Sequence, residues 1–278
     1  MYLYYPDEGF GTIYRRVMLN DFFTKLLDQA KIQTVAEIPV DPYGIIGAGS
    51  LIFTRMGATV TLISEDMNVL RRARALMEFN CASEVCYLQS LVYRIPVPDN
   101  RFDFTWNFDV LLTLTDQKKF LRELCRVSKA TLVVIPNACS YGQYLHHIYH
   151  LITNTTCMHA GPRSWMKTAP IRTVLERNGM TIIAEGIIDV PWWPSFPELP
   201  NMVRRLLGHS PVGVDGHGIP EANPRVVQPE ELPSMYSAVA RSAFIERGCL
   251  WPRPVKQVFA HNLYVMGCKP EHRQALGL

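Results

Sequence analysis

The chain has 278 residues, of which 48% are hydrophobic and 19% charged, and its formal net charge is +3. This length and hydrophobic content suit one α/β domain with a large core. The charge is small and no basic stripe with interleaved aromatic residues is present, which argues against nucleic-acid binding.

Cysteine usage and the first residues of the chain indicate the compartment. The seven cysteines are scattered, odd in number and never arranged as Cys-x-x-Cys, which is typical of reduced thiols and not of a disulfide framework. Residues 1–7 show no basic segment leading into an apolar core, and no apolar run is long enough to span a membrane. We therefore expect a cytoplasmic protein without a membrane span.

Apolar periodicity predicts that strands and helices alternate in the first half of the chain. An amphipathic helix is expected over 12–31. Short apolar strands follow at 34–38, 59–64, 85–88, 102–106 and 131–135. Helices are expected at 44–56, 68–80 and 116–127, with Gly57 ending the first and Asp116 as the N-cap of the last. This alternation predicts a mostly parallel sheet with helices on both faces, which binds ligands at the carboxyl ends of its strands.

The second half of the chain has a different rhythm. Helices are expected at 143–151, 168–178 and 233–247, and strands at 180–188 and 257–268. An aromatic- and His-rich stretch at about 138–165 and a Pro- and Gly-rich stretch at about 191–233 are expected to be caps over a site. We therefore expect a single domain over 1–278, with the helix 12–31 before the sheet and these two cap segments inserted.

The most specific motifs surround the fourth predicted strand. Residues 99–111 read DNRFDFTWNFDVL, and residues 120–127 read FLRELCRV. Together with the segments 60–74 and 262–268, they resemble the class I S-adenosylmethionine-dependent methyltransferases. The resemblance covers about 33–136, 171–190 and the last strand. It implies a Rossmann-like seven-stranded sheet with a reversed C-terminal hairpin, and S-adenosylmethionine as the cofactor.

The first predicted turn departs from the pattern of that family. Glu37 matches the acidic residue before the family's glycine loop, but Pro39, Asp41 and Tyr43 replace the three glycines that let the cofactor approach the backbone. Gly44 begins a shifted glycine cluster, which provides an alternative close approach at the start of the helix. The usual cofactor cradle is therefore altered.

Other cofactor positions also differ from the family. Ser64 stands where the family has the acid that binds the ribose hydroxyls, and Glu65 follows it directly. Ser90, with Leu91, replaces the Gly-Asp pair that the family often places beside the adenine, so the resemblance implies that this polar contact is missing. Asn107 and Phe108 occupy the expected loop after the fourth strand. The resemblance implies these cofactor-binding residues: Glu37, Pro39, Asp41, Gly44, Ser64, Glu65, Ser90, Asn107 and Phe108.

Methyl transfer from a sulfonium demands positioning more than a particular catalytic side chain. A base is needed only when the acceptor carries a proton with a high pKa. The candidate catalytic residues are Asp109 and Tyr144, although Asp109 also suits a capping or solvated role. The residues expected to line the acceptor site are Tyr14, Tyr141, His146, His150 and Trp165. Core packing is the alternative for the aromatic ones.

The histidines at 146–159 suit a metal site only in part. His146 and His150 lie at i and i+4, with Cys157 and His159 nearby, but no carboxylate of the His-Glu-x-x-His type lies between the two. We therefore expect no metal. Cys139 lacks His–Asp support and is interpreted as an inert thiol.

The sequence predicts an S-adenosylmethionine-dependent methyltransferase that acts on a small molecule or a cofactor intermediate. The alternative is a non-catalytic methyltransferase-like binding or scaffolding protein, which the altered glycine loop and the Pro-rich stretch favour. A Rossmann-type dehydrogenase is disfavoured because no G-x-G-x-x-G follows the first strand. Besides a small-molecule acceptor, a second copy of the chain or another protein stays open as a partner.

Overall fold

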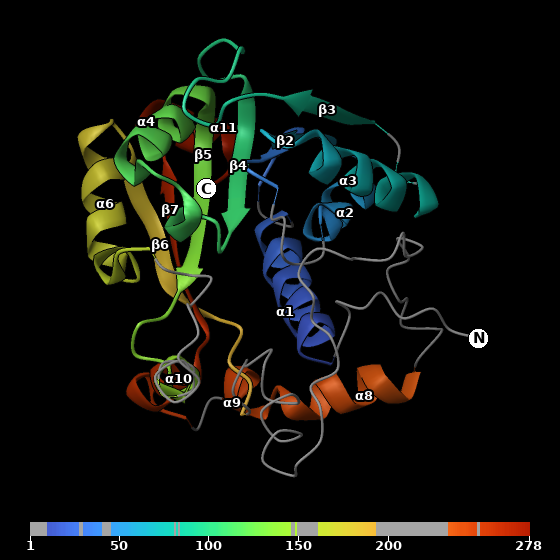
Figure 1. Ribbon diagram of the computed structural model, residues 1–278, viewed down its shortest axis with the longest axis vertical. Coiled ribbons are helices and arrows are strands. Elements are labelled where there is room, and N and C mark those ends of the chain that lie inside the picture. The colour runs from blue at the N-terminus through green and yellow to red at the C-terminus, as the bar shows by residue number, and fades with distance from the viewer. Residues whose placement is uncertain are drawn as a thin grey trace.

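The computed structural model describes residues 10–27, 30–40, 46–80, 82, 84–145, 148, 161–192, 233–248 and 251–278. These residues form a seven-stranded sheet of order β3-β2-β1-β4-β5-β7-β6 (Figure 1). β1 to β5 run parallel to one another, whereas β7 is antiparallel to both β5 and β6. The predicted Rossmann-like sheet with a reversed C-terminal hairpin is confirmed.

The described elements have the following bounds. The strands are β1 Thr34–Glu37, β2 Thr59–Ser64, β3 Val85–Gln89, β4 Phe102–Phe108, β5 Ser128–Pro136, β6 Thr181–Ile188 and β7 Asn262–Cys268. The α-helices are α1 Phe10–Leu27, α2 Leu51–Arg55, α3 Met67–Phe79, α4 Gln117–Val127, α6 Thr168–Arg177, α8 Pro233–Ser242, α9 Phe244–Arg247, α10 Arg253–Phe259 and α11 Pro270–Leu276. Short 3-10 turns are η1 Ala48–Ser50, η2 Leu111–Thr113 and η3 Arg163–Trp165.

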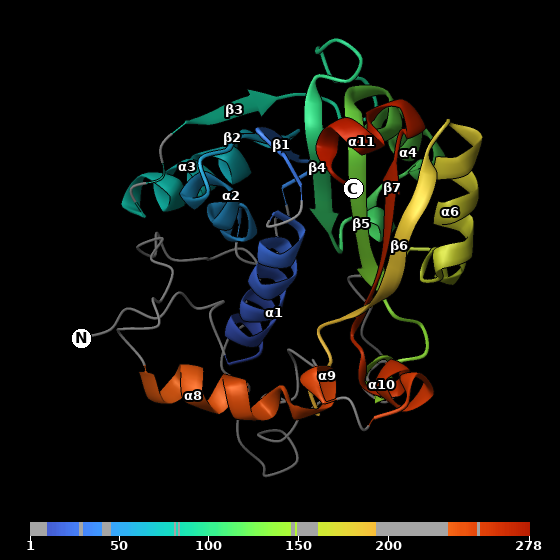
Figure 2. The ribbon, with the colours of Figure 1, turned by 180° about the vertical axis from the view of Figure 1, so that it is seen from behind.

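Two hydrophobic cores cover the two faces of the sheet (Figures 1 and 2). The first contains side chains from α1, α2, α3 and α11, and the second from α4 and α6. All seven residues of β4 are buried, because this central strand is covered on both sides. The short, continuously apolar strands of the sequence are explained by this double cover.

Several local signals act as the sequence predicts. Asp116 caps α4 by accepting a hydrogen bond from the Lys119 N–H at 2.9 Å. Gly57, which follows α2, and Gly179, which follows α6, both have a φ of +83°, a conformation that glycine adopts without a steric cost. These residues set the ends of three helices.

Several predicted boundaries were wrong, among them the helix expected at 44–56, where the described residues form only the 3-10 turn η1 and the short helix α2. The last strand begins at Asn262 and not at residue 257, because α10 occupies Arg253–Phe259. A proline in its first turn favours this helix. The helix expected at 233–247 is divided into α8 and α9, the helix expected at 12–31 ends at Leu27, and α11 was not predicted. Most of the helix expected at 143–151 lies outside the described residues.

The carboxyl ends of β1, β4 and β5 meet at one edge of the sheet. Helix α1 lies across this edge, with α8, α9 and α10 beyond it (Figures 1 and 2). Large parts of the predicted cap segments, 149–160 and 193–232, are outside the described residues. In the part of the chain that the structure describes, no helix is long and apolar enough to cross a membrane.

Candidate cofactor and acceptor site

Asn107 lies at the carboxyl end of β4 and is fully buried. Its register partner on β5 is Val133, and the neighbouring Trp106 carbonyl accepts from the Ile38 N–H at 2.9 Å. Among the described residues, neither Asn107 Oδ1 nor Asn107 Nδ2 has a hydrogen-bond partner. Because an unpaired buried amide destabilises a fold by about 1–3 kcal/mol, such groups are rare unless a ligand or water completes them. Asn107, predicted in a loop, thus lies in the strand, one residue before its end, and its side-chain amide has no hydrogen-bond partner among the described residues.

Glu37, the acid before the first turn, is hydrogen-bonded to Ser50 in the 3-10 turn η1. Ser50 Oγ donates to Glu37 Oε2 at 2.6 Å and accepts from Trp106 Nε1 at 3.0 Å. All three side chains are buried. Of the other positions expected in this turn, Pro39 is half-buried, whereas Asp41 and Gly44 lie outside the described residues.

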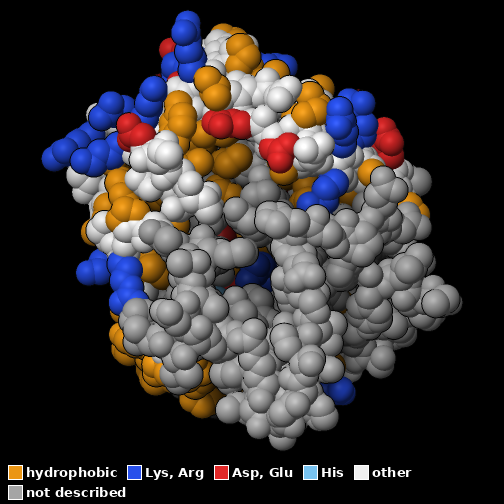
Figure 3. Space-filling view, in the orientation of Figure 1, with side chains coloured by type: hydrophobic (Ala, Val, Ile, Leu, Met, Phe, Trp, Pro, Cys, Tyr) orange, Lys and Arg blue, Asp and Glu red, His pale blue; other side chains and the backbone are white. Residues whose placement is uncertain are grey.

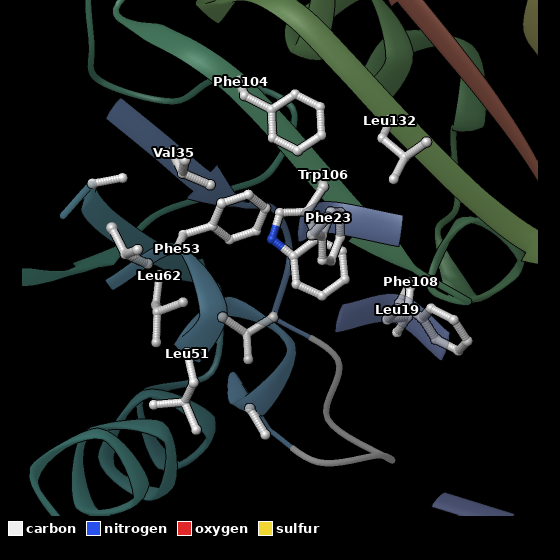
Figure 4. Packing of buried hydrophobic residues seen from close by; sticks show 14 of the residues in the cluster. Leu19, Phe23, Val35, Leu51, Phe53, Leu62, Phe104, Trp106, Phe108 and Leu132 are labelled. Carbon is white, nitrogen blue, oxygen red and sulfur yellow. The ribbon is translucent and has the colours of Figure 1, made fainter. Parts of the chain in front are cut away.

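Trp106 fills the space between β4 and the turn that begins α2. Its indole lies next to Phe23 of α1 and Phe53 of α2 (Figure 4). The ring centroids of Trp106 and Phe23 are 5.0 Å apart. A Cβ added to Gly49 would lie 2.4 Å from the indole, so only glycine fits there. The glycine cluster predicted to approach the cofactor therefore makes room, at Gly49, for a side chain of the protein itself.

The ends of β2 and β3 bring three further predicted residues together. Ser64 is buried, and its Oγ accepts from the Asp66 N–H at 3.2 Å. Glu65 is exposed, and its Oε1 accepts from the Val92 N–H at 3.0 Å. The Ser90 N–H donates to the Ser64 carbonyl at 3.1 Å, so the two strand exits are adjacent. Glu65 therefore fixes the loop after β3 through this hydrogen bond, and the last residue of β2 is Ser64 and not an acid.

A depression of about 510 Å³ is lined in part by this loop. Its lining consists of Ser90, Leu91, Arg94, Ile95, Pro96 and Arg126. Arg126 is engaged by Glu123, by Asp99 and by the carbonyls of Val97 and Ile95. These contacts fix the connection between β3 and β4, and we assign the depression no small-molecule ligand.

A polar network joins α1 to the β6 exit and to the residue before β7. Arg15 Nε donates to Asp189 Oδ2 at 3.2 Å, and His261 Nδ1 lies 3.4 Å from the same oxygen. Asp189 and His261 are both buried. Burial alone would raise the pKa of Asp189, but hydrogen bonding and charge from His261 and Arg15 lower it below its ordinary value. Asp189 is therefore held as a carboxylate.

Tyr14 extends this network to α9. Its hydroxyl donates to Glu246 Oε2 at 2.9 Å, and the backbone N–H groups of Asp189 and Val190 donate to the same carboxyl group at 3.2 and 2.9 Å. Burial is the largest cause that raises the pKa of Glu246, and the nearby Asp189 raises it further. Burial and Glu246 also raise the pKa of Tyr14. Glu246 and Tyr14 therefore both favour their neutral, protonated forms.

The remaining residues predicted to be catalytic or to line the acceptor site lie in different surroundings, and the structure does not bring them together in one described pocket. Asp109 follows β4 with a φ of +59°, and its Oδ1 accepts from Asn262 Nδ2 at 3.2 Å. Tyr141 donates its hydroxyl to the Trp192 carbonyl at 2.8 Å, whereas Tyr144 is exposed. Trp165 packs in the core between the sheet and α4 and α6. His146 and His150 lie outside the described residues.

The sequence did not single out Trp106, Ser50, Arg15, Asp189, His261 or Glu246. One signal was present: Asp189 follows β6 directly, and polar residues at strand exits mark sites in such folds. No group of three potential metal ligands occurs among the described residues. His146, His150, Cys157 and His159 are not among them.

Comparison with known sequences gives a partial match. Residues 44–134 match the family model "Methyltransferase domain". A malonyl-[acyl-carrier protein] O-methyltransferase of Buchnera aphidicola subsp. Baizongia pistaciae (strain Bp) is 30% identical over 115 residues, which are 41% of this chain and 44% of that protein. The match therefore spans less than half of the length of this curated relative.

Solved structures share the fold at low sequence identity. A methyltransferase of Thermotoga maritima, a possible histamine N-methyltransferase, has a TM-score of 0.52 at 12% identity, covering 93% of this chain and 91% of its own. Magnesium protoporphyrin IX methyltransferase of Synechocystis PCC 6803, with bound S-adenosylhomocysteine, has a TM-score of 0.50 at 13% identity, covering 65% of this chain and 80% of its own. Residues 44–134 thus match the methyltransferase-domain family model, and the chain has the fold of the class I S-adenosylmethionine-dependent methyltransferases.

Proposed function

We propose that the chain is an S-adenosylmethionine-dependent methyltransferase that acts on a small molecule or a cofactor intermediate. The observation that carries this proposal is the fully buried Asn107 amide at the carboxyl end of β4, whose two polar atoms have no hydrogen-bond partner in the described part of the chain. In a parallel sheet the ligand binds beyond this edge. A bound cofactor that offers a donor and an acceptor would complete the amide.

The described residues around this edge fit such a cofactor. The adjacent exits of β2 and β3 bring Ser64, Glu65 and Ser90 to one side of β1, and Asn107 and Phe108 lie on the other side. Glu65 is exposed and uses one carboxylate oxygen for Val92, so its second oxygen suits a ribose hydroxyl. Asp41 and Gly44 belong to the proposed site by their place in the sequence between β1 and η1.

The chemistry divides between the cofactor and the chain. The cofactor would supply an electrophilic methyl group. The chain would hold the acceptor in line with it and keep water away, because alignment and exclusion of water lower the barrier of such a displacement. Phe108 and Tyr14 provide apolar walls, and Asp109 is the proposed base for acceptors that must lose a proton, steadied by Asn262. Tyr141 and Trp192 would close the acceptor side through their hydrogen bond.

A specific observation supports a second candidate function. The carboxylate of Glu37, which faces the cofactor in the family, is already bonded to Ser50, and Pro39 provides no N–H for the turn. A non-catalytic methyltransferase-like binding or scaffolding protein would keep this arrangement without loss.

Isothermal titration calorimetry separates the two candidates. The enzyme should bind S-adenosylmethionine and S-adenosylhomocysteine with micromolar affinity. The Asn107→Ala variant should bind both at least about tenfold more weakly, because a buried hydrogen bond contributes about 1–3 kcal/mol. Absence of heat at millimolar cofactor would reject the enzyme and leave the scaffold.

A further inference from the structure

We propose that α4 and the connection between β3 and β4 form a docking surface for an acidic protein segment. Seven of the residues of α4 are buried, and every residue of this helix that is not buried is a cation: Lys118, Lys119, Arg122 and Arg126. At 3.6 residues per turn these four positions lie on one face of the helix. The part of α4 that a partner could reach is therefore entirely basic.

This cationic face borders the connection between β3 and β4. Lys119 Nζ lies 5.6 Å from the ring centroid of Tyr93. Arg126 donates to the carbonyls of Ile95 and Val97, at 2.8 Å in both cases. Figure 3 shows basic side chains gathered over α4, at the upper left of the face, next to apolar ones. Cationic and apolar groups thus share one continuous surface.

Most cations of this surface have no carboxylate partner. Glu123 and Asp99 both bind Arg126, and Asp116 is used as the cap of α4. In the described part of the chain, no carboxylate forms an ion pair with the other cations of the surface, which are Arg94, Lys118, Lys119 and Arg122. A partner that carries several carboxylates would supply this missing negative charge.

A depression with apolar lining adjoins the cations. Its lining includes Leu91, Ile95 and Pro96 together with Arg94 and Arg126. Leu91 is 63% exposed, the highest value for a large hydrophobic side chain among the described residues. A depression that combines an exposed leucine with cations suits an apolar side chain of the partner, flanked by acidic ones.

Hydrogen bonds hold this surface in place before a partner binds. Glu123 Oε1 accepts from the Ile95 N–H at 2.6 Å. The Tyr93 hydroxyl accepts from the Thr115 N–H, directly before α4, at 2.9 Å. Because these bonds connect the segment between β3 and β4 to the helix, docking would cost little conformational entropy.

The chemistry of the surface favours a protein over a nucleic acid. The ring of Tyr93 lies beside Lys119 and its hydroxyl is bonded to the backbone, so this ring is not open for stacking on a base. The exposed Leu91 would gain nothing from a phosphate backbone, whereas an acidic segment with an apolar side chain uses both features. The cations of the surface do not belong to the proposed cofactor site, so the inference is independent of methyl transfer.

Fluorescence anisotropy of the full chain with labelled peptides tests the surface. The first peptide repeats the unit Glu-Glu-Leu-Glu, the second has Ala in place of Leu, and the third has Gln in place of Glu. We expect the first to bind most tightly, because it offers both carboxylates and an apolar side chain. Its affinity should fall as NaCl is raised from about 50 to about 500 mM, since salt screens exposed charges.

Two variants locate the binding. Lys119→Glu combined with Arg122→Glu should weaken binding of the first peptide at least about tenfold, and Leu91→Ser at least about threefold. The matched control combines Lys25→Glu on α1 with Arg71→Glu on α3, both exposed, so it changes the net charge by the same amount. It should bind as the parent does. Arg122→Gln alone serves if the first double variant does not fold.

Four results would overturn the assignment. The first peptide does not bind, or the variants on α4 bind it as the parent does. A labelled oligothymidylate binds more tightly than the peptide and is lost in those variants, which would assign the surface to nucleic acid. The chain dimerises in sedimentation and the variants are monomeric, which would make a second copy the occupant. Failure to bind S-adenosylmethionine would reject the proposed methyltransferase and leave these titrations unaffected.

Discussion

The indole N–H of Trp106 and the carboxylate of Glu37 meet at one hydroxyl group, that of Ser50. The two contacts measure 3.0 and 2.6 Å, and they join β4, β1 and the turn before α2. Since β1 and β4 are neighbours in the sheet, this bridge fixes the geometry of the first turn from both sides.

Removal of the bridge should destabilise the protein. Ser50→Ala leaves the Trp106 N–H without its acceptor and takes one donor from Glu37, so the free energy of unfolding should fall by about 1–3 kcal/mol. Urea denaturation followed by tryptophan fluorescence measures the change. The matched control is Ser237→Ala on the exposed face of α8, which should stay within about 0.5 kcal/mol. Equal effects of the two substitutions would contradict the buried bridge.

Gly49 and Trp106 should behave as a coupled pair. Gly49→Ala places a methyl group 2.4 Å from the end of the indole and should lower the free energy of unfolding by about 1–3 kcal/mol. In the Trp106→Phe background the smaller ring leaves room, so the added cost should shrink. A double-mutant cycle measures this coupling. If the two changes in the free energy of unfolding simply add, Gly49 and Trp106 are not in steric contact, and the prediction fails.

We expect the Asn107 amide to lower the stability of the cofactor-free protein and to be required for cofactor binding. Asn107→Leu replaces an unpaired buried amide by an apolar group of similar size, so the cofactor-free protein should become more stable by about 1 kcal/mol while cofactor binding is lost. Thr105→Val, two residues earlier on the same strand, removes a buried hydroxyl that is paired with Thr131 at 2.8 Å and should instead destabilise. Thermal unfolding and calorimetric titration together check the opposite signs. A loss of stability in the leucine variant would mean that the amide is already satisfied.

Glu246 should make stability depend on pH. Its pKa in the folded protein is raised above the ordinary value of 4.5, mainly by burial, so the folded state holds a proton that the unfolded state has released. The stability from this group is complete below pH 4.5 and is lost as the pH rises through the folded-state value. Glu246→Gln cannot titrate and should lack this decline. Urea denaturation between about pH 4 and pH 8 compares the two proteins, and parallel curves would refute the raised pKa.

The sheet could be predicted from the sequence, because its strands carry local signals. β2 was predicted to the residue since it lies between Gly57 and the polar pair Glu65 and Asp66. The start of β7 was misplaced because the apolar residues of α10, such as Val258 and Phe259, suit either a strand or a helix. Only the position of α10 in the folded chain decides between them.

The sequence could place the candidate residues only where they lie at strand ends. Ser64 and Asn107 lie in the last residues of β2 and β4, and Glu65 and Ser90 directly follow β2 and β3, where this architecture brings side chains together. The polar network beyond this edge depends on contacts such as that between Arg15 and Asp189, which are 174 residues apart. Neither residue has a neighbour in sequence that signals the pairing, so periodicity and motifs carried no information about it.

Helix α1 is attached to the far end of the chain. Tyr14 bonds to Glu246 across 232 positions, Arg15 to Asp189 across 174, and Asp21 to Arg247 across 226. During synthesis, β1 to β5 emerge from the ribosome long before these partners exist. The parallel half of the sheet can thus form early, whereas α1 obtains its partners Asp189, Glu246 and Arg247 only when most of the chain has been synthesised.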